Sequence, residues 1–439
     1  MSKILINISG PIRPYSADER SILLSEVDIG SSLGYEIAEK LRRFCSYHRS
    51  NLLLISEQRF GLASNQMLIW MYEILELATK KIPKAPGYSF DPAFVNALLH
   101  LVDAVEELQD KRPSLEAMVR QLFSEITSFE ATSIGMEINR PFNIEHWSDE
   151  AKSVGRVIIF CPNPFSLYTS MILHLCLIFG IEVSGVVVRR FTVHRFISEL
   201  RRDGFTRLLK KIMRKLIIRG DENAEDSKES LKKLHDELIG SSPNIYSLCK
   251  ENEIELMKVK EFEDCSNWMG RISPDLGFFT GGGMVSSGIL DVFSVGVLNM
   301  HMGVLPKYKG MDVVQAAVLE NENVGMTAHI MAPKLDAGPV VNTLSLSPLG
   351  YPSLGYLRNS MSAYGPLLAF DSMLGLFAGR LRKIEQPISG RQYYVMHPLL
   401  IDLTNNVLKA QSLKLGSLKN HLSKILTKVI NKVKTTRLE

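Results

Sequence analysis

The hydrophobic pattern divides the chain into two parts, and the first is helical. Up to about residue 150, apolar positions recur every three or four residues, which is the spacing of an amphipathic helix. The segments with this spacing are SLGYEIAEKLRRF, QMLIWMYEILELATKK, AFVNALLHLVDAVEELQDK and SLEAMVRQLFSEITSF. Proline-rich connections such as KKIPKAPGYSFDP separate them. Residues 1–150 are therefore predicted to form an all-α domain, for which oligomerisation or docking is the simplest role.

From residue 156 onward, short β-branched runs alternate with helical stretches. Strands are expected in RVIIFCP, IEVSGVVVRR, DLGFFTGG, VGVLNMH and VGMTAHIMA, and helices near 165–179 and 311–320. Alternating β and α units predict a mostly parallel sheet with helices on both faces. Residues 156–386 are therefore predicted to form an α/β domain.

Two basic segments accompany this domain. One is a largely helical insertion at about 189–240, and the other is a helical extension at 387–439. Such runs are typical of the solvated face of an amphipathic helix. Binding of phosphate or of an anionic membrane surface is the alternative interpretation of the same charge.

The composition is that of an ordinary globular protein, with 45% hydrophobic and 22% charged residues. A net charge of +4 over 439 residues gives no strong indication of a nucleic-acid partner. The five cysteines never form a CxxC pair, which argues against a disulfide framework or a metal site and favours a cytoplasmic location. The longest uncharged stretch, 157–181, contains the loop signal CPNPFSLYTS, so a buried strand, loop and helix are expected rather than a transmembrane segment.

The candidate chemistry begins in the segment VLNMHMGVLPKYKG. Asn299 and His301 are two residues apart near the end of an expected strand, so their side chains share one face. Asp336, in KLDAGP, follows another expected strand, which places all three residues at the carboxyl edge of the sheet. When an amine attacks a carbonyl, an amide and an imidazole can stabilise the oxyanion, and a carboxylate can take the proton. These residue types therefore suggest acyl transfer to an amine.

The residues around these three positions strengthen that interpretation. From PDLGFFTGGGMVSSGILD through LNMHMGVLPKYKG to VGMTAHIMAPKLDAGPVVNT, the chain resembles the folate-dependent formyltransferase family. This family includes glycinamide ribonucleotide, methionyl-tRNA and sugar-amine N-formyltransferases. The resemblance implies a Rossmann-like catalytic domain that transfers a formyl group from N10-formyltetrahydrofolate to a primary amine. It also implies that Asn299, His301 and Asp336 are the catalytic residues.

The resemblance further implies where the two ligands bind, and no metal is involved. The donor would lie against the glycine turn and beside the loop that carries the catalytic aspartate, at Gly281, Gly282, Gly283, Met284 and Leu335. The acceptor would lie at the loop after the catalytic histidine, at Leu305, Lys307, Tyr308, Lys309 and Gly310. The chain has Met302 and Gly303 where the family commonly has a Pro-Ser or similar pair.

The acceptor is expected to be a small molecule, either an amino sugar or another specialised biosynthetic amine. A tRNA enzyme of this family is expected to carry a β-rich C-terminal domain, and the purine-synthesis enzyme to be a compact single domain. Three alternatives stay open. They are a 10-formyltetrahydrofolate hydrolase, in which water replaces the amine, a methionyl-tRNA formyltransferase, and a non-catalytic interaction protein that keeps the fold. Three other polar residues are expected to stabilise the structure and not to take part in catalysis. His329 and His397 are expected to be structural, and Asp312 is expected to cap a helix.

Overall fold

The computed structural model describes most of the chain beyond residue 142. The described residues are 112–124, 136–138, 142–190, 229–240, 244–281, 283, 285–387, 390–393, 395–412 and 420–437, together with 92, 95, 96 and 99. Most of the expected all-α domain and of the basic insertion therefore lies outside the described residues, as does the expected oligomerisation surface.

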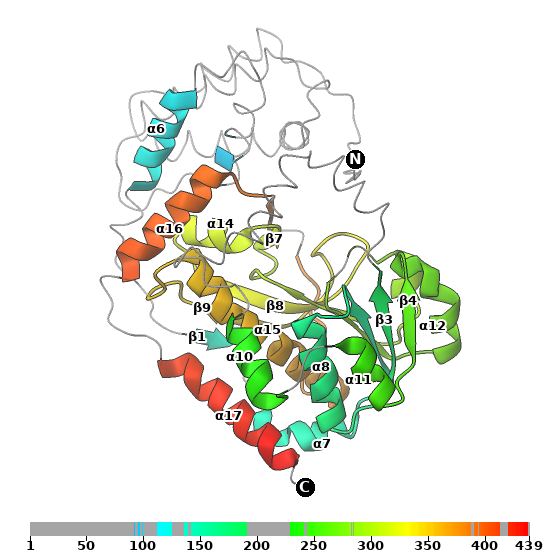
Figure 1. The fold of residues 1–439 in the computed structure, drawn as a ribbon. Helices are drawn as coiled ribbons and strands as arrows, with labels where there is room; N and C mark the ends of the chain where they lie inside the picture. Colours follow the sequence, from blue (N-terminus) through cyan, green and yellow to red (C-terminus); the bar gives the residue numbers. More distant parts are fainter. Residues whose placement is uncertain are drawn as a thin grey trace, which may run out of the picture.

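The described part of the chain is organised around one large β-sheet (Figure 1). Its strands are β1 (Met136–Ile138), β2 (Val157–Cys161), β3 (Val183–Arg189), β4 (Leu256–Val259), β5 (Leu276–Phe279), β6 (Gly296–His301), β8 (Val324–Ile330) and β9 (Val340–Leu346). They lie in the order β1-β9-β8-β6-β5-β2-β3-β4. Strands β4, β3, β2, β5 and β6 are parallel, while β8, β9 and β1 each run antiparallel to the preceding neighbour. The prediction of a mostly parallel α/β sheet is confirmed.

Helices cover both faces of this sheet. They are α7 (Trp147–Ala151), α8 (Leu167–Ile178), α10 (Glu229–Leu238), α11 (Ile245–Glu251), α12 (Ser266–Ile272), α13 (Ser287–Leu290), α14 (Val313–Leu319) and α15 (Leu354–Phe377), with 3-10 turns η4 (Ile144–His146) and η5 (Phe262–Cys265). Strand β2 shows how the layers arise. Ile159 belongs to the core that includes α8 and α15, whereas Phe160 belongs to a second core with α12 and α13. Successive strand residues point to opposite faces, so an uninterrupted apolar strand supports a layer on each side.

The sheet domain begins earlier along the chain than residue 156. Strand β1, which lies inside the segment expected to be all-α, pairs with β9. Trp147 Nε1 donates a hydrogen bond to Asp371 on α15 (2.8 Å), and Arg380 forms an ion pair with Glu150 (2.8 Å). The described residues between Met136 and Ala151 therefore pack as part of the α/β unit, a boundary that the change of hydrophobic period near residue 156 did not reveal.

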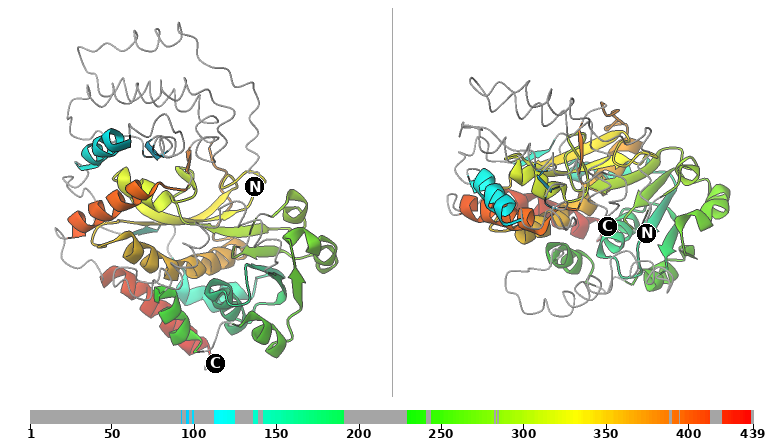
Figure 2. Two further views of the ribbon diagram at one scale, coloured as in Figure 1. Left: turned by 45° about the horizontal axis from the view of Figure 1, so that its top comes forward. Right: turned by 90° about the horizontal axis from the view of Figure 1, so that it is seen from above.

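The described C-terminal residues are also integrated into the fold. Strand β10 (Arg391–Tyr393) pairs in parallel with β7 (Tyr308–Gly310), the strand that follows β6. Helix α16 (Pro398–Ser412) packs on α14, on α15 and on α6 (Arg112–Ser124). Helix α17 (Asn420–Thr436) packs beside α10 (Figure 2). The described part of the extension is therefore a short strand followed by two helices, and its apolar side chains Val407, Val429 and Val433 are buried in the main core. Among the described residues, no helix is long and apolar enough to cross a membrane.

Candidate active site

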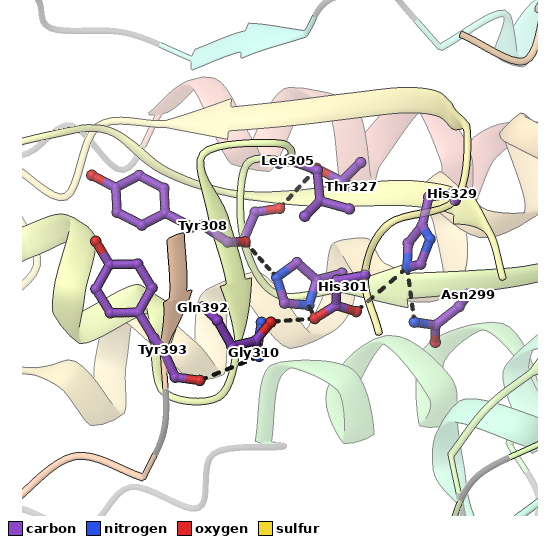
Figure 3. Close-up of polar contacts among 12 residues, drawn as sticks. Asn299, His301, Leu305, Tyr308, Gly310, Thr327, His329, Gln392 and Tyr393 are labelled. Carbon is purple, nitrogen blue, oxygen red and sulfur yellow. Dashed lines mark hydrogen bonds and ion pairs between the residues drawn. The ribbon is translucent and has the colours of Figure 1, made fainter. Parts of the chain in front are cut away.

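The end of β6 supplies the first two polar residues of the site. Asn299 and His301 lie on one face of this strand, and Asn299 stands opposite His329 of β8. His301 is only 7% exposed. Figure 3 shows Asn299 turned toward His329, and His301 turned toward the backbone of Tyr308. The strand therefore places the amide and the imidazole as its sequence predicts.

Asp336 reaches the same place by a route that differs from the expected one. Because β8 runs antiparallel to β6, its carboxyl end pairs with Leu298 rather than extending beyond His301. Between β8 and β9 the chain loops out and closes with a hydrogen bond from the Ile330 N–H to the Pro339 carbonyl (2.9 Å). Gly338 permits this closure, since a Cβ there would lie 1.9 Å from the Ile330 oxygen. The loop, and not the direction of the strand, brings Asp336 to the site.

The Asp336 carboxylate lies at the centre of the cluster and is 7% exposed. Its Oδ2 lies 3.5 Å from His301 Nδ1 and accepts a hydrogen bond from the Gly310 N–H (2.7 Å). Its Oδ1 lies 3.8 Å from His329 Nε2. Gln386 donates to the Asp336 carbonyl (3.1 Å), which anchors the loop backbone. The backbone of Asp336 adopts a left-handed conformation with φ of 50°, a conformation that costs free energy and that concentrates at functional sites.

His329 holds the Asn299 amide. Burial lowers the pKa of His329 to about 4; the charge of Asp336 partly opposes this effect, while His301 adds to it. The imidazole is therefore neutral near pH 7. Its Nδ1 faces the Ile330 carbonyl at 3.1 Å, so that nitrogen carries the proton and Nε2 accepts a hydrogen bond from Asn299 Nδ2 (3.1 Å). Sequence reasoning assigned His329 a structural role, whereas the structure places it in direct contact with a candidate catalytic residue. No local pattern in the sequence gives the antiparallel register that sets His329 opposite Asn299.

His301 is held from the other side by the turn that follows it. Its Nε2–H donates to the Tyr308 carbonyl (2.8 Å), so both ring nitrogens face oxygen atoms. Thr327 on β8 donates to the Gly303 carbonyl (2.7 Å) and accepts from the Leu305 N–H (3.1 Å), which ties the turn to the sheet. A Cβ at Gly303 would lie 2.7 Å from His301 Nε2 and 2.9 Å from the Tyr308 oxygen. The glycine that departs from the family pattern thus makes room for the ring.

The expected donor-binding turn follows β5. Because Phe279 pairs with Asn299, the turn starts beside the amide. Gly281 and Gly283 have φ of 110° and 131°, values that residues with a Cβ rarely adopt. Gly282 and Met284 lie outside the described residues. Leu335, next to the central aspartate, is 61% exposed, so its side chain is accessible to a ligand.

The expected acceptor residues fall into two groups. Leu305 and Tyr308 are buried, and the Tyr308 hydroxyl donates to Glu320 (2.8 Å), so these two side chains stabilise the loop from inside. Lys307 is half exposed and forms an ion pair with Glu322 (2.7 Å). Lys309 and Gly310 are partly exposed on β7, where the Gly310 N–H is already bound to the carboxylate. The expected contacts of Lys307 and Lys309 with an acceptor remain predictions.

Asp312 stands at the N-cap position of α14, but its side chain does not cap the helix as expected. It precedes α14 with φ of 51°, and its side chain accepts from Arg358 (2.8 Å), from Gln315 (3.1 Å) and from the Met396 N–H (2.9 Å). The structure shows no bond from its side chain to the α14 backbone. Asp312 therefore joins the C-terminal segment to the loop that contacts the central carboxylate.

The arrangement of these residues is typical of a group-transfer site. A neutral imidazole orients an amide, a backbone N–H binds a buried carboxylate that a second imidazole faces, and all of these lie at the edge of an α/β sheet. Such a set offers a hydrogen-bond donor for an oxyanion beside a proton acceptor, as a group-transfer site requires.

Comparison with known proteins finds a family match in one segment of the chain. Residues 276–348 match the sequence model described as "Formyl transferase". The methionyl-tRNA formyltransferase of Saccharopolyspora erythraea is 31% identical over 113 residues, which cover 26% of this chain and 37% of that protein. The methionyl-tRNA formyltransferase of Pseudothermotoga lettingae is 30% identical over 139 residues, 31% of this chain and 45% of that protein. Residues 276–348 are therefore a formyltransferase-family segment, which confirms the resemblance over this part of the chain.

The extent of these matches is partial. The chain spans less than half the length of the two curated relatives it matches. Among solved structures, glycinamide ribonucleotide transformylase 1 from Symbiobacterium toebii is 15% identical, with a TM-score of 0.36 over 56% of this chain and 95% of that chain.

Proposed function

We propose that this protein transfers a formyl group from N10-formyltetrahydrofolate to a primary amine. One observation carries the proposal: Asn299, His301 and Asp336 converge, from a strand and a separate hairpin loop, on one buried cluster. The formyl transferase match spans all three residues and supports the same reaction.

The transfer begins when the amine nitrogen attacks the formyl carbon. A carbon–nitrogen bond forms and the carbonyl oxygen becomes an oxyanion. Asn299 Nδ2 has two hydrogens, and only one is used on His329. The second is available to the oxyanion, and loss of one such donor typically costs roughly 3–4 kcal/mol. His301 Nε2–H donates to the Tyr308 carbonyl, and its Nδ1 lies 3.5 Å from Asp336 Oδ2, so the ring lies against the carboxylate that we propose as the proton acceptor.

The amine nitrogen must then lose a proton. The Asp336 carboxylate accepts it, either directly or through one water molecule. When the intermediate collapses, the bond from carbon to N10 breaks and N10 takes up a proton. The products are tetrahydrofolate and a formamide, and no covalent bond to the enzyme forms. Gly281, Gly283 and Leu335 are the described residues proposed to contact the donor.

An amino sugar or another specialised biosynthetic amine remains the proposed acceptor. A second candidate is methionyl-tRNA, because the curated relatives quoted above carry that name. The matched residues contain the proposed transfer site, and they cover less than half of those relatives, so the acceptor is a separate question.

The test is release of tetrahydrofolate from N10-formyltetrahydrofolate by the purified full chain. The reaction is run with water alone and with amino sugars, nucleotide-linked amino sugars and methionyl-tRNA. Release that depends on an amine supports the transferase and identifies its acceptor class. Release with water alone identifies a hydrolase. If the folate is neither bound nor consumed, the proposal is wrong and the interaction-protein alternative replaces it.

A further inference from the structure

Asn96 is a buried asparagine that lies far from the site residues in the sequence. It contacts a segment of the chain that borders the candidate active site. Asn96 has helical backbone and is 6% exposed. Its Nδ2 donates to the Val395 carbonyl (3.1 Å), and its Oδ1 accepts from the His397 N–H (2.5 Å). One amide side chain thus satisfies two backbone groups of the segment 395–397. The formyltransferase match covers residues 276–348, so Asn96 and the segment 395–397 lie outside it.

Apolar packing accompanies these hydrogen bonds. Val95 and Leu99 are buried in the hydrophobic core that also contains Met396 and Leu399. The contact therefore combines directional hydrogen bonds with burial, which is the combination that holds a segment in one place.

The same segment is bound on its other side to the loop of the candidate active site. The Met396 N–H, between the two groups held by Asn96, donates to Asp312 Oδ2 (2.9 Å). Strand β10, just before it, pairs with β7. Figure 3 shows Gln392 and Tyr393 beside Gly310. A Cβ at Gly310 would lie 2.2 Å from the Tyr393 carbonyl, so β10 and β7 are in close contact.

Strand β7 in turn contacts the reacting groups. The Gly310 N–H binds Asp336 Oδ2, the carboxylate oxygen that also faces His301, and the Tyr308 carbonyl accepts from the His301 ring. A displacement of the segment 391–397 would therefore move two groups that orient the carboxylate and the imidazole. A misplacement of about 1 Å in such groups can cost about 100-fold in rate.

We infer that Asn96 is a positioning residue for formyl transfer. By holding 395–397 it keeps β10, and through β10 the β7 backbone, in the geometry that orients Asp336 and His301. The inference rests on the proposed function, and it gives the segment around Asn96 a part in the reaction without contact to either ligand.

The experiment compares Asn96→Ala with Asn359→Ala in the full chain. Asn359 is a matched control, because it is 5% exposed and accepts from a backbone N–H, that of Ser230 (2.7 Å) on α10. Amide hydrogen exchange is measured without ligands. The kcat and KM are measured with N10-formyltetrahydrofolate and the amine that supports turnover. Asn96→Ser, which keeps a hydroxyl for one of the two backbone groups, repeats the test if Asn96→Ala does not fold.

Asn96→Ala is expected to speed exchange of the amides at 308–312 and to lower kcat about tenfold, with the KM for the folate unchanged. Asn359→Ala should do neither, although both variants lose stability. Unchanged exchange at 308–312, or equal kcat in the two variants, would overturn the inference. If wild-type protein transfers formyl to no amine, the proposed function has failed, and the exchange measurement alone then decides whether Asn96 controls the β7 backbone.

Discussion

Two histidine pairs among the described residues have nearly the same ring geometry, and in both pairs the rings are buried or half-buried. His301 and His329 lie with ring centroids 6.5 Å apart and planes at 85°, and His174 and His235 lie 6.0 Å apart at 84°. Burial lowers the pKa of His329, His174 and His235 alike. Neither ring geometry nor a perturbed pKa therefore distinguishes a candidate active site from a structural contact in this protein.

The difference lies in the carboxylate. Between His301 and His329 stands Asp336, buried and held on a loop with left-handed backbone. The pair on α8 and α10 instead shares the Ser170 hydroxyl, 2.8 Å from His235 Nε2, and its neighbouring carboxylate, Asp236, is largely exposed. A carboxylate that the fold buries beside two imidazoles is the feature that marks the first pair as the candidate site.

The largest effect should follow from removing that carboxylate's charge. Asp336→Asn keeps the shape of the side chain but cannot accept the amine proton, so kcat should fall roughly 100- to 10,000-fold. His301→Ala should also abolish most transfer, because the carboxylate loses its ring partner. Asp236→Asn is the matched change at the other pair and should leave kcat unchanged. Near-wild-type turnover of either active-site variant would disprove the mechanism.

A smaller loss of activity is expected when the His301 ring is displaced without being removed. Gly303→Ala adds a methyl group within 2.7 Å of His301 Nε2 and 2.8 Å of Val313, so the ring or the turn must shift. We expect kcat to fall about tenfold or more because of this misplacement. Gly288→Ala, where a Cβ meets nothing within 4 Å, is the control for added volume. Equal kinetics in the two variants would show that Gly303 does not position the ring.

The second histidine pair should respond in stability and not in activity. Ser170→Ala leaves the buried His235 Nε2 without its partner and should lower the free energy of unfolding by about 1–3 kcal/mol. Urea unfolding gives the loss, and tetrahydrofolate release measures turnover alongside it. A drop in kcat of the folded variant would mean that the His174–His235 pair affects the geometry of the candidate active site.

The last effect leaves activity near pH 7 unchanged; it is common to both pairs and depends on pH. Each of the three histidines has a lowered pKa in the folded state, to about 4 for His329, against 6.5 in the unfolded chain. Below pH 6.5 the unfolded chain therefore binds more protons, and stability should decrease as the pH falls toward 4. His329→Gln should reduce that slope in urea unfolding measured between pH 7 and 4.5. An unchanged slope would mean that His329 does not titrate as its burial implies.

Much of the site could be predicted from local pattern alone. The apolar run ending in Asn299 and His301 predicts a strand with both side chains on one face, because strand periodicity is a local property of the backbone. The alternation of strands and helices after residue 156 likewise predicts the parallel block β4-β3-β2-β5-β6. The formyltransferase resemblance lies in the same short motifs and assigned Asp336 to the site.

Other features could not be found in the sequence, because they depend on which distant segments meet. Strand direction is one: β8 has the composition of a parallel strand and yet runs antiparallel, so the 331–338 loop has to carry Asp336 back to His301. The contact between His329 and Asn299 follows from that register. Tyr308 is expected to face a ligand, but its side chain is buried. Its ring lies against Tyr393, and both tyrosine hydroxyls donate to Glu320.

The sequence by itself thus determined the chemical groups and their local spacing, because both depend only on residues that are neighbours in the chain. The tertiary structure decided what holds those groups in place. Asn96 lies more than two hundred residues before Gly310 and Asp312. Only the folded chain brings these residues together around the segment 391–397 and strand β7. Hydrogen bonds of this kind join backbone groups whose positions depend on the whole packing arrangement, and no local pattern encodes them.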